Sequence, residues 1–378
     1  MFIRCLAPLS QFFRPLPPYS TPMKILKKAL IVVLTPVLLF GLYLGGNILF
    51  AFLTDFKPPY SEAMELRGMP SQDQPDSIIS FLNWNIGYSG LGQKADFFYD
   101  GGTTVISPEA DVKAYFDGIK NTVTKADSID FILLQEVDTL AKRSYHVNQF
   151  TEIGNAAKGY GYSFATNYDV KFVPKPFTEP LGKVVAGLMT LTKFFPKEIT
   201  RYQYPGRFEF PTYLFFLDRC FLLNRYSLKN GKELLVINTH NSAYDNTGEM
   251  KKGELEMLKK FIIEEYAKGN YIIVGGDWNQ CPPHFDPMKF NKGKTEAPYT
   301  PQLQDPSFLP SDWTWAVDTT VATNRNLITA YDATKTFTTV IDYYLLSPNV
   351  EPLVVKTWDM QFAYSDHQPV YLKVKLKN

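Results

Sequence analysis

Acidic, amide and imidazole side chains recur at the ends of short apolar runs through the last three-quarters of this 378-residue chain. Those runs are typical of β-strands, and strands far apart in the sequence can bring such side chains to one edge of a sheet. The residues concerned are Asn85, Glu136, His240, Asp277, Asn279, Asp342, Asp366 and His367. Carboxylate and amide oxygens suit Mg²⁺, and groups around a bound metal can stabilise charge on phosphoryl oxygens. The pattern therefore predicts metal-assisted chemistry on a phosphate group.

The elements expected to carry these side chains are mainly strands, with two long helices between them. Apolar residues at helical spacing after Glu109 predict one amphipathic helix, and a second runs from about Glu249 to Ala267. The expected strands are 78–83, 131–134, 187–192, 213–223, 234–238, 271–274, 340–346, 353–358 and 370–376. The irregular stretch 280–335 is typical of a functional loop. Because helices lie between only some of the strands, the pattern favours a mixed α/β sandwich over a doubly wound sheet.

Six short blocks carry the polar side chains and follow one another in a recognisable order. They are Asn-Trp-Asn at 83–85, Gln-Glu-Val-Asp at 135–138, Asn-Thr-His at 238–240, Gly-Asp-Trp-Asn at 276–279, Ile-Asp-Tyr at 341–343 and Ser-Asp-His-Gln-Pro-Val at 365–370. In kind and order the blocks resemble those of the endonuclease/exonuclease/phosphatase superfamily, over about residues 78–378. The resemblance implies a deoxyribonuclease I-like fold of the α/β class (α+β type). This is a four-layer sandwich of two face-to-face mixed β-sheets flanked by helices, with an active site between the sheet edges.

The same resemblance implies a divalent metal ion and its ligands. Glu136 is similar to the principal Mg²⁺ ligand of the family, Asn85 to the amide near the metal and the scissile phosphate, and Asp366 to a second carboxylate on the metal side. Mg²⁺ keeps several waters and takes only one or two carboxylates, so few protein ligands are needed. Mn²⁺ or Ca²⁺ could take its place.

The remaining residues have implied roles in the reaction itself. By resemblance, Asp277 orients or deprotonates the attacking water, and Asn279 bonds a non-bridging phosphate oxygen. His240 matches the branch of the family in which this histidine protonates the leaving oxygen. Asp342 is expected to orient His367 and fix its tautomer, which leaves the other ring nitrogen for the phosphate. The implied reaction is in-line attack of water on a phosphorus ester.

A charge-free apolar segment at residues 29–54 predicts a transmembrane helix or signal anchor, because roughly 20 such residues cross a bilayer. The leader at 1–28 holds five basic and no acidic residues. This excess of positive charge places the leader in the cytoplasm and the catalytic domain of a single-pass protein outside it, in the periplasm or the extracellular space. A cleaved signal peptide is the alternative, which the length of the run and the lack of a small-residue cleavage site disfavour. Met23 is an alternative start, since a basic stretch follows it directly.

Beyond the span, residues 55–77 are polar and proline-bearing, which predicts a linker to a catalytic domain at 78–378. Five of the 39 basic residues and none of the 38 acidic ones precede residue 54, so the rest carries 34 basic against 38 acidic residues. Proteins that bind duplex nucleic acid usually have a basic surface, so this balance disfavours a nuclease without excluding one. In an oxidising space, Cys220 and Cys281 would either pair or stay as buried thiols.

The sequence leaves the substrate open among phospholipid head groups, small phosphodiesters or phosphomonoesters, and nucleic acid. The membrane anchor, the acidic domain and the aromatic residues Phe290, Trp313 and Trp315 favour a lipid or another small phosphodiester, because exposed aromatic rings can enter a bilayer surface. A catalytically silent, membrane-tethered binding domain is the alternative from another class, and the complete set of polar residues argues against it. Nothing in the sequence indicates an obligate protein partner.

Overall fold

The computed structural model describes residues 22–245, 247–296 and 302–377. The chain divides near residue 50 into an N-terminal unit and a folded domain. Helix α1 (Pro22–Leu53) has 32 residues, which rise roughly 48 Å and exceed the hydrocarbon thickness of a bilayer, about 30 Å. By length and composition it could cross a membrane as an anchor, and a signal sequence meets the same criteria. It begins before the predicted span, and residues 1–21 of the predicted leader lie outside the described residues.

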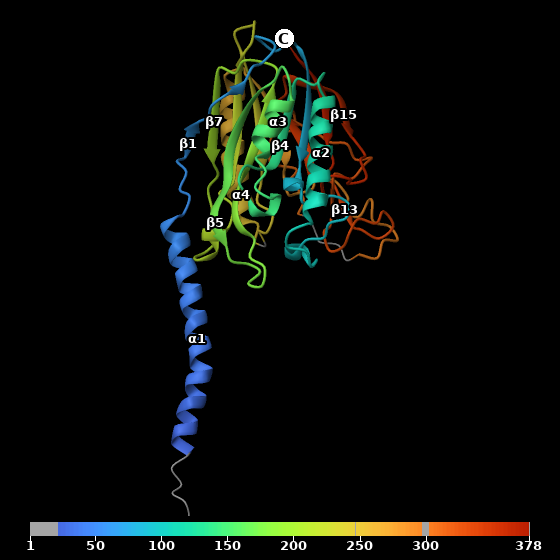
Figure 1. Cartoon of the computed structure of the whole chain (residues 1–378). Coiled ribbons are helices and arrows are strands. Elements are labelled where there is room, and N and C mark those ends of the chain that lie inside the picture. Colours follow the sequence, from blue (N-terminus) through green and yellow to red (C-terminus); the bar gives the residue numbers. More distant parts are fainter. Residues whose placement is uncertain (1–21, 246, 297–301, 378) are drawn as a thin grey trace, which may run out of the picture. The chain divides into compact units, whose positions relative to one another are not determined.

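Two seven-stranded mixed sheets make up the folded domain (Figure 1). The first has the order β1 (Ser61–Ala63), β7 (Glu198–Gln203), β8 (Cys220–Ser227), β9 (Glu233–His240), β10 (Tyr271–Asp277), β14 (Asp342–Leu346), β11 (Thr314–Ala316). The second has the order β15 (Val350–Thr357), β16 (Val370–Leu376), β3 (Ile78–Asn85), β4 (Phe131–Asp138), β6 (Gly182–Thr192), β5 (Gly161–Val173), β2 (Arg67–Gly68). Strands β9 and β10 run parallel, as do β3 and β4, and the other pairs that the structure describes are antiparallel.

Three helices cover the outer faces of the sheets and complete the predicted four layers. Helices α2 (Glu109–Lys125) and α3 (Gln149–Ala156) bury their apolar faces on the sheet that holds β4 (Figure 1). Helix α4 (Glu249–Ala267) packs Leu258 and Ile262 on the outer face of β9 and β10. Shorter elements are η1 (Gly87–Ser89), η2 (Phe98–Asp100), η3 (Lys142–Ser144), η4 (Thr212–Phe215), β12 (Asn324–Arg325) and β13 (Thr338–Thr339). The predicted sandwich is confirmed.

The inner faces of the two sheets change from apolar to polar along their strands. In β9, Leu234 and Val236 belong to the apolar layer between the sheets, and Asn238 and His240 follow at the two-residue spacing of the same face. The same change occurs in β3 (Ile79 and Phe81, then Asn83 and Asn85), in β4 (Phe131 and Leu133, then Gln135) and in β10 (Tyr271 and Ile273, then Asp277). The sandwich therefore has an apolar half and a polar half, and the polar half holds the predicted site residues.

A network of three buried amides joins the two sheets where the apolar half ends. Gln135 of β4 donates from Nε2 to Asn83 Oδ1 and to Asn238 Oδ1, both at 2.8 Å. Asn83 donates across the sandwich to the carbonyl of Gly276 at 3.1 Å. Asn238 donates in the opposite direction to the carbonyls of Leu134 and Met189. Such networks fix the position of one sheet relative to the other because each broken bond leaves a buried polar group unpaired.

Residues 55–77 are not wholly a linker. Strand β1 pairs with β7 and strand β2 pairs with β5, so the segment forms an edge of each sheet. Short edge strands of this kind carry no long apolar pattern, which is why composition predicted only a tether. The predicted strand at 213–223 is also wrong in its first half, where η4 stands, and β8 runs on to Ser227.

Two further expectations are decided by packing. Cys220 and Cys281 are both free and buried, so the structure contains no bond between them. The aromatic residues expected to reach a membrane surface pack on the domain core instead. Trp313 is 7% exposed and stacks edge-on with Tyr266, and Phe290 and Trp315 pack on the same cluster. Trp313 is buried, and Phe290 and Trp315 are partly buried.

We expect Gln135→Leu to destabilise the domain, because it removes the donor to two buried amide oxygens without removing the oxygens. The loss of free energy of unfolding should be about 1–3 kcal/mol for each acceptor left unpaired. Urea denaturation of the full chain in detergent, followed by tryptophan fluorescence, measures it. Gln74→Leu, at an exposed position, is the matched control. Equal stability of the two variants would contradict the role given to the network.

Candidate active site

Three neighbouring strands of the first sheet place an imidazole and two carboxylates side by side. Asp277, the last residue of β10, is in register with His240 at the end of β9 and with Asp342 at the start of β14. Gly276 permits this close spacing, since a Cβ there would come within 2.0 Å of the carbonyl oxygen of Thr239. The glycine thus serves the close packing of β9 and β10.

Glu136 reaches the site through an irregularity in β4. Strict alternation would turn it away from the side of Gln135, but the register against β6 shifts between Leu134 and Val137. Glu136 itself has a φ of 55°, in the left-handed region that non-glycine residues seldom adopt. Its side chain lines the pocket and is 25% exposed. Backbone strain of this kind is characteristic of functional positions.

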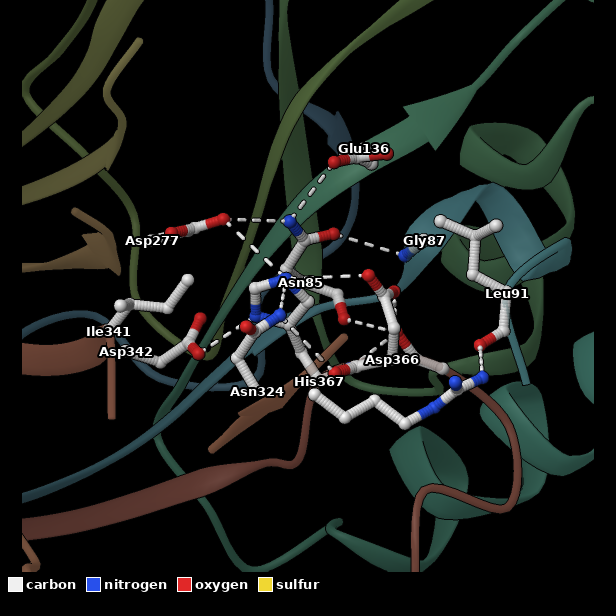
Figure 2. Close-up of polar contacts among 12 residues, drawn as sticks. Asn85, Gly87, Leu91, Glu136, Asp277, Asn324, Ile341, Asp342, Asp366 and His367 are labelled. Atoms are coloured by element: carbon white, nitrogen blue, oxygen red, sulfur yellow. Dashed lines mark hydrogen bonds and ion pairs between the residues drawn. The ribbon is translucent and has the colours of Figure 1, made fainter. Parts of the chain in front are cut away.

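Asn85 lies at the centre of the polar cluster, between residues of both sheets. Figure 2 shows its amide nitrogen directed at Glu136 and Asp277, at 3.1 and 3.0 Å. Its amide oxygen accepts from the backbone nitrogen of Gly87 at 3.0 Å. One side chain therefore orients a carboxylate from each sheet.

His367 is held by Asp342 and by the side chain of Asn324. Its Nδ1 lies 2.8 Å from Asp342 Oδ2, and its Nε2 lies 3.1 Å from the Asn324 amide (Figure 2). Burial alone would lower the pKa of His367, but the charges of the carboxylates around it, Asp342 first, raise the pKa well above its usual value. His367 is therefore a protonated imidazole at neutral pH.

His240 has the opposite electrostatic environment. Its Nε2 lies 3.4 Å from Asp277 Oδ2 and 4.0 Å from Glu136 Oε1, and its Nδ1 is buried without a hydrogen-bond partner among the described residues. Burial, and then the positive charges of Arg219 and His367, lower the pKa of His240 well below its usual value. It is therefore a neutral imidazole that can donate one hydrogen bond.

Asp277 accepts hydrogen bonds at both carboxylate oxygens, from Asn85 and from the backbone nitrogen of Asn279. Burial raises the pKa of Asp277 to about 7, and the charge of Asp342 acts in the same direction. Asn279 lines the same pocket with a φ of 50°, and its side-chain nitrogen donates to the carbonyl of Asn241 at 2.8 Å. The fixed turn after β10 therefore holds both residues of the predicted pair.

Asp366 enters the cluster from the loop before β16. Its Oδ1 lies 3.3 Å from Ser365 Oγ, and its Oδ2 lies 3.8 Å from His367 Nε2. Burial raises the pKa of Asp366 to about 6, and the negative charge of Glu136 adds to the shift. Gly87 leaves room for it: the φ there is +49°, and a Cβ would lie 2.7 Å from Asp366 Oδ1.

All eight residues predicted from the sequence line or border one pocket of about 730 Å³. The sequence analysis did not single out Asn324, which contacts His367, or Arg219 and Lys251, which line the same pocket. Asn324 lies within the irregular stretch 280–335, where only the length of the loop hinted at a role. Arg219 directly precedes β8, and Lys251 is in the first turn of α4. Neither position carries a local pattern that marks it.

Two sets of side chains could hold a metal ion. Asp277, Asp342 and His367 offer ligand atoms within 4.8 Å of one another. However, the His367 imidazole in this set is engaged by Asp342, and Mg²⁺ prefers oxygen ligands. Glu136, Asp366 and Asn85 carry oxygen atoms, and the nitrogen of the Asn85 amide, rather than its oxygen, is directed at Glu136. Burial is the main cause of the raised pKa of Asp366, and the charge of Glu136 adds to it.

Comparisons with known proteins agree with the fold of the domain. A model of the endonuclease/exonuclease/phosphatase family matches residues 82–367, whereas no curated protein sequence matches the chain. An endonuclease/exonuclease/phosphatase from Beutenbergia cavernae DSM 12333 is 14% identical, with a TM-score of 0.53 over 80% of this chain and 72% of that chain. ANGEL2, described as a 2′,3′-cyclic phosphatase, is 15% identical, with a TM-score of 0.50 over 84% and 99%. A protein of the same family from Leptotrichia buccalis C-1013-b is 14% identical, with a TM-score of 0.50 over 79% and 100%. At these identities the likeness concerns the fold.

We expect Mg²⁺ to raise the unfolding temperature of the protein, because an ion that binds only the folded state stabilises it by mass action. Glu136→Gln should remove most of that increase, whereas Glu152→Gln, at an exposed position of α3, should keep it. Thermal unfolding at a series of Mg²⁺ concentrations measures the effect. An increase that survives Glu136→Gln but is lost in Asp342→Asn would place the ion at the other set of side chains.

Proposed function

Because the chain belongs to the endonuclease/exonuclease/phosphatase family, we propose that it is a metal-dependent phosphoesterase in which water attacks a phosphate ester in line. The observation that carries the proposal is the arrangement of Asp277 between a neutral and a protonated imidazole in one pocket. A base, a hydrogen-bond donor and a positively charged imidazole thus lie around the Asp277 carboxylate. These are the groups that hydrolysis of a phosphate ester requires.

Asp277 is the proposed group that orients the attacking water and accepts its proton. A carboxylate with a pKa of about 7 is suited to this task, because roughly half of it is ionised at neutral pH and it is basic enough to take a proton. Its hydrogen bonds from Asn85 and from the Asn279 backbone hold it in one orientation. Glu136, Asp366 and Asn85 would hold the divalent ion, which when bound supplies charge stabilisation to the phosphoryl oxygens.

The two histidines are proposed to act differently. His367, kept protonated by Asp342, offers a fixed positive charge to a phosphoryl oxygen. His240 is neutral, so it would donate a hydrogen bond to the leaving oxygen or to a phosphoryl oxygen rather than carry a full charge to it. Asn279, whose amide lines the pocket, is the further proposed donor to a non-bridging oxygen.

The proposed substrates are small phosphodiesters or phosphomonoesters, including phospholipid head groups. The folded part of the chain carries slightly more acidic than basic residues, which disfavours the alternative of a nuclease. The second alternative is a catalytically silent binding domain. Such a domain does not require a buried carboxylate with a pKa near 7, so the environment of Asp277 disfavours it. Because Phe290, Trp313 and Trp315 pack on the domain core, they do not favour a lipid over the other members of this substrate class.

The function is tested with the full chain in detergent. It should hydrolyse bis(4-nitrophenyl) phosphate or 4-nitrophenyl phosphate with Mg²⁺ or Mn²⁺, and lose the activity in excess chelator. Asp277→Asn should lower kcat by roughly 10²–10³, as loss of one transition-state group does. Asp312→Asn, exposed and away from the pocket, is the control. Hydrolysis that continues after exhaustive chelation, or that is unaffected by Asp277→Asn, would contradict the mechanism.

We also propose that α1 is a retained anchor and that the catalytic domain lies outside the cytoplasm. The proposal rests on the basic residues before the span and on the length of the helix. A periplasmic or extracellular reporter fused after Asn378 should be active, and the fusion should sediment with membranes. A shortened soluble form in the periplasm or medium would show instead that the span is a cleaved signal.

A further inference from the structure

Several buried hydrogen-bond donors of the pocket residues have no acceptor in the described part of the chain, and two of them belong to segments that are bonded to each other. Arg219 Nη1 and Asn167 Nδ2 are both inaccessible to solvent, and neither has a hydrogen-bond partner among the described residues. Both residues line the pocket that holds His240 and Asp277. An unpaired buried donor costs about 1–3 kcal/mol, and more when the group is charged. Such donors in a cavity indicate that an acceptor from outside the chain completes them.

The two donors come from different sheets and are held next to each other. Asn167 belongs to β5, and Arg219 directly precedes β8. The backbone nitrogen of Asp218 donates to the carbonyl of Asn167 at 2.8 Å, and the carbonyl of Arg219 accepts from Tyr204 at 2.9 Å. These bonds fix the backbone of both donors at the end of the pocket formed by β5 and β8.

Arg219 differs from the other arginines of the same pocket. Arg143 is bidentate on Asp138, and Arg325 donates to the carbonyls of Leu91, Gly92 and Ala95. The fold itself therefore engages both guanidinium groups, although Nε of Arg325 is buried without a partner among the described residues. For Arg219 the described part of the chain supplies neither an ion pair within 4.0 Å nor a side-chain hydrogen bond, so its charge is available to a ligand.

A second cation adds to the positive charge near Arg219. Lys251 is 5% exposed, lines the pocket, and donates from Nζ to the carbonyl of Asn279 at 3.2 Å. The charge of Arg219 acts on both His240 and Lys251, lowering the pKa of each after the larger effect of burial. Arg219 and Lys251 therefore lie near His240, and the carboxylate of Asp245 in the same pocket acts on Lys251.

The space around these groups is larger than a phosphate requires. The whole pocket measures about 730 Å³, and aromatic side chains, including Tyr168, Phe216 and Tyr244, form part of its wall. An organic group could lie along them while its far end meets the guanidinium of Arg219. Guanidinium groups bind phosphate and carboxylate with paired, geometrically matched hydrogen bonds.

We propose that Arg219, with Asn167 and Lys251, binds a second anionic group of the substrate, so that the preferred substrates are phosphate esters whose organic part ends in a phosphate or a carboxylate. This inference rests on the proposed phosphoesterase function and adds to it a substrate class. It accounts for the unpaired donors of Arg219 and Asn167 and for a cavity larger than one phosphate requires.

The test compares three esters that differ only in the far group: 4-nitrophenyl ethyl phosphate, 4-nitrophenyl 2-carboxyethyl phosphate and 4-nitrophenyl 2-phosphoethyl phosphate. We expect kcat/KM of the full chain with Mg²⁺ to be roughly tenfold or more higher for at least one of the two charged esters than for the ethyl ester, as one charge-assisted contact allows. Arg219→Gln and Asn167→Ala should each lower that ratio towards one. Arg207→Gln, at an exposed position away from the pocket, should keep it.

The same esters are titrated into Asp277→Asn with Mg²⁺ by calorimetry, so that binding is read without turnover. If a charged ester binds more tightly than the ethyl ester and the difference is lost on adding Arg219→Gln, the second-anion site is supported. This holds even if the full chain hydrolyses none of the esters, because the absence of hydrolysis would contradict only the proposed function. Equal kcat/KM and equal binding of all three esters, or a preference that survives Arg219→Gln, would overturn the second-anion site. A preference for only one charged ester would identify the far group as phosphate or carboxylate.

Discussion

The hydrogen bonds among Asn83, Gln135 and Asn238 are the constraint on which the rest of the structure depends. Apolar packing between sheets is non-directional and tolerates small slides, whereas these amides allow one relative position. Every residue of the candidate site lies just beyond them, on strands of both sheets or on loops that follow. The distance between Glu136 on one sheet and Asp277 on the other is therefore set by amides that take no part in the chemistry.

That constraint explains how two similar histidines acquire opposite charge states. His367 comes from the second sheet but reaches Asp342 of the first, and the carboxylates around it keep it protonated. His240 lies closer to Arg219 and is buried without a compensating hydrogen bond at Nδ1, so it is neutral. The two rings lie a few ångströms from the same carboxylate of Asp277. They keep different charged neighbours because the position of one sheet relative to the other is fixed.

The sequence predicted the sandwich, the helix Glu249–Ala267 and the residues that meet at the site, because each rests on a local pattern of strand, helix or short motif. It missed the edge strands β1 and β2, because their partners are distant in the sequence. Strand β1 pairs with β7, over a hundred residues away, and β2 pairs with β5, about a hundred residues away. It also missed Arg219 and Asn167. An arginine before a strand and an asparagine within one are ordinary in sequence, and only the folded chain reveals that both lack an acceptor.

The backbone conformation of Glu136 has a consequence for how this protein can change over time. A left-handed residue that is not glycine costs the fold about 1–2 kcal/mol, and glycine would remove that cost. The substitution that most relaxes this strand is thus one that deletes the carboxylate. Selection for thermal robustness alone would push this position away from glutamate, so its retention depends on continued demand for what the side chain does.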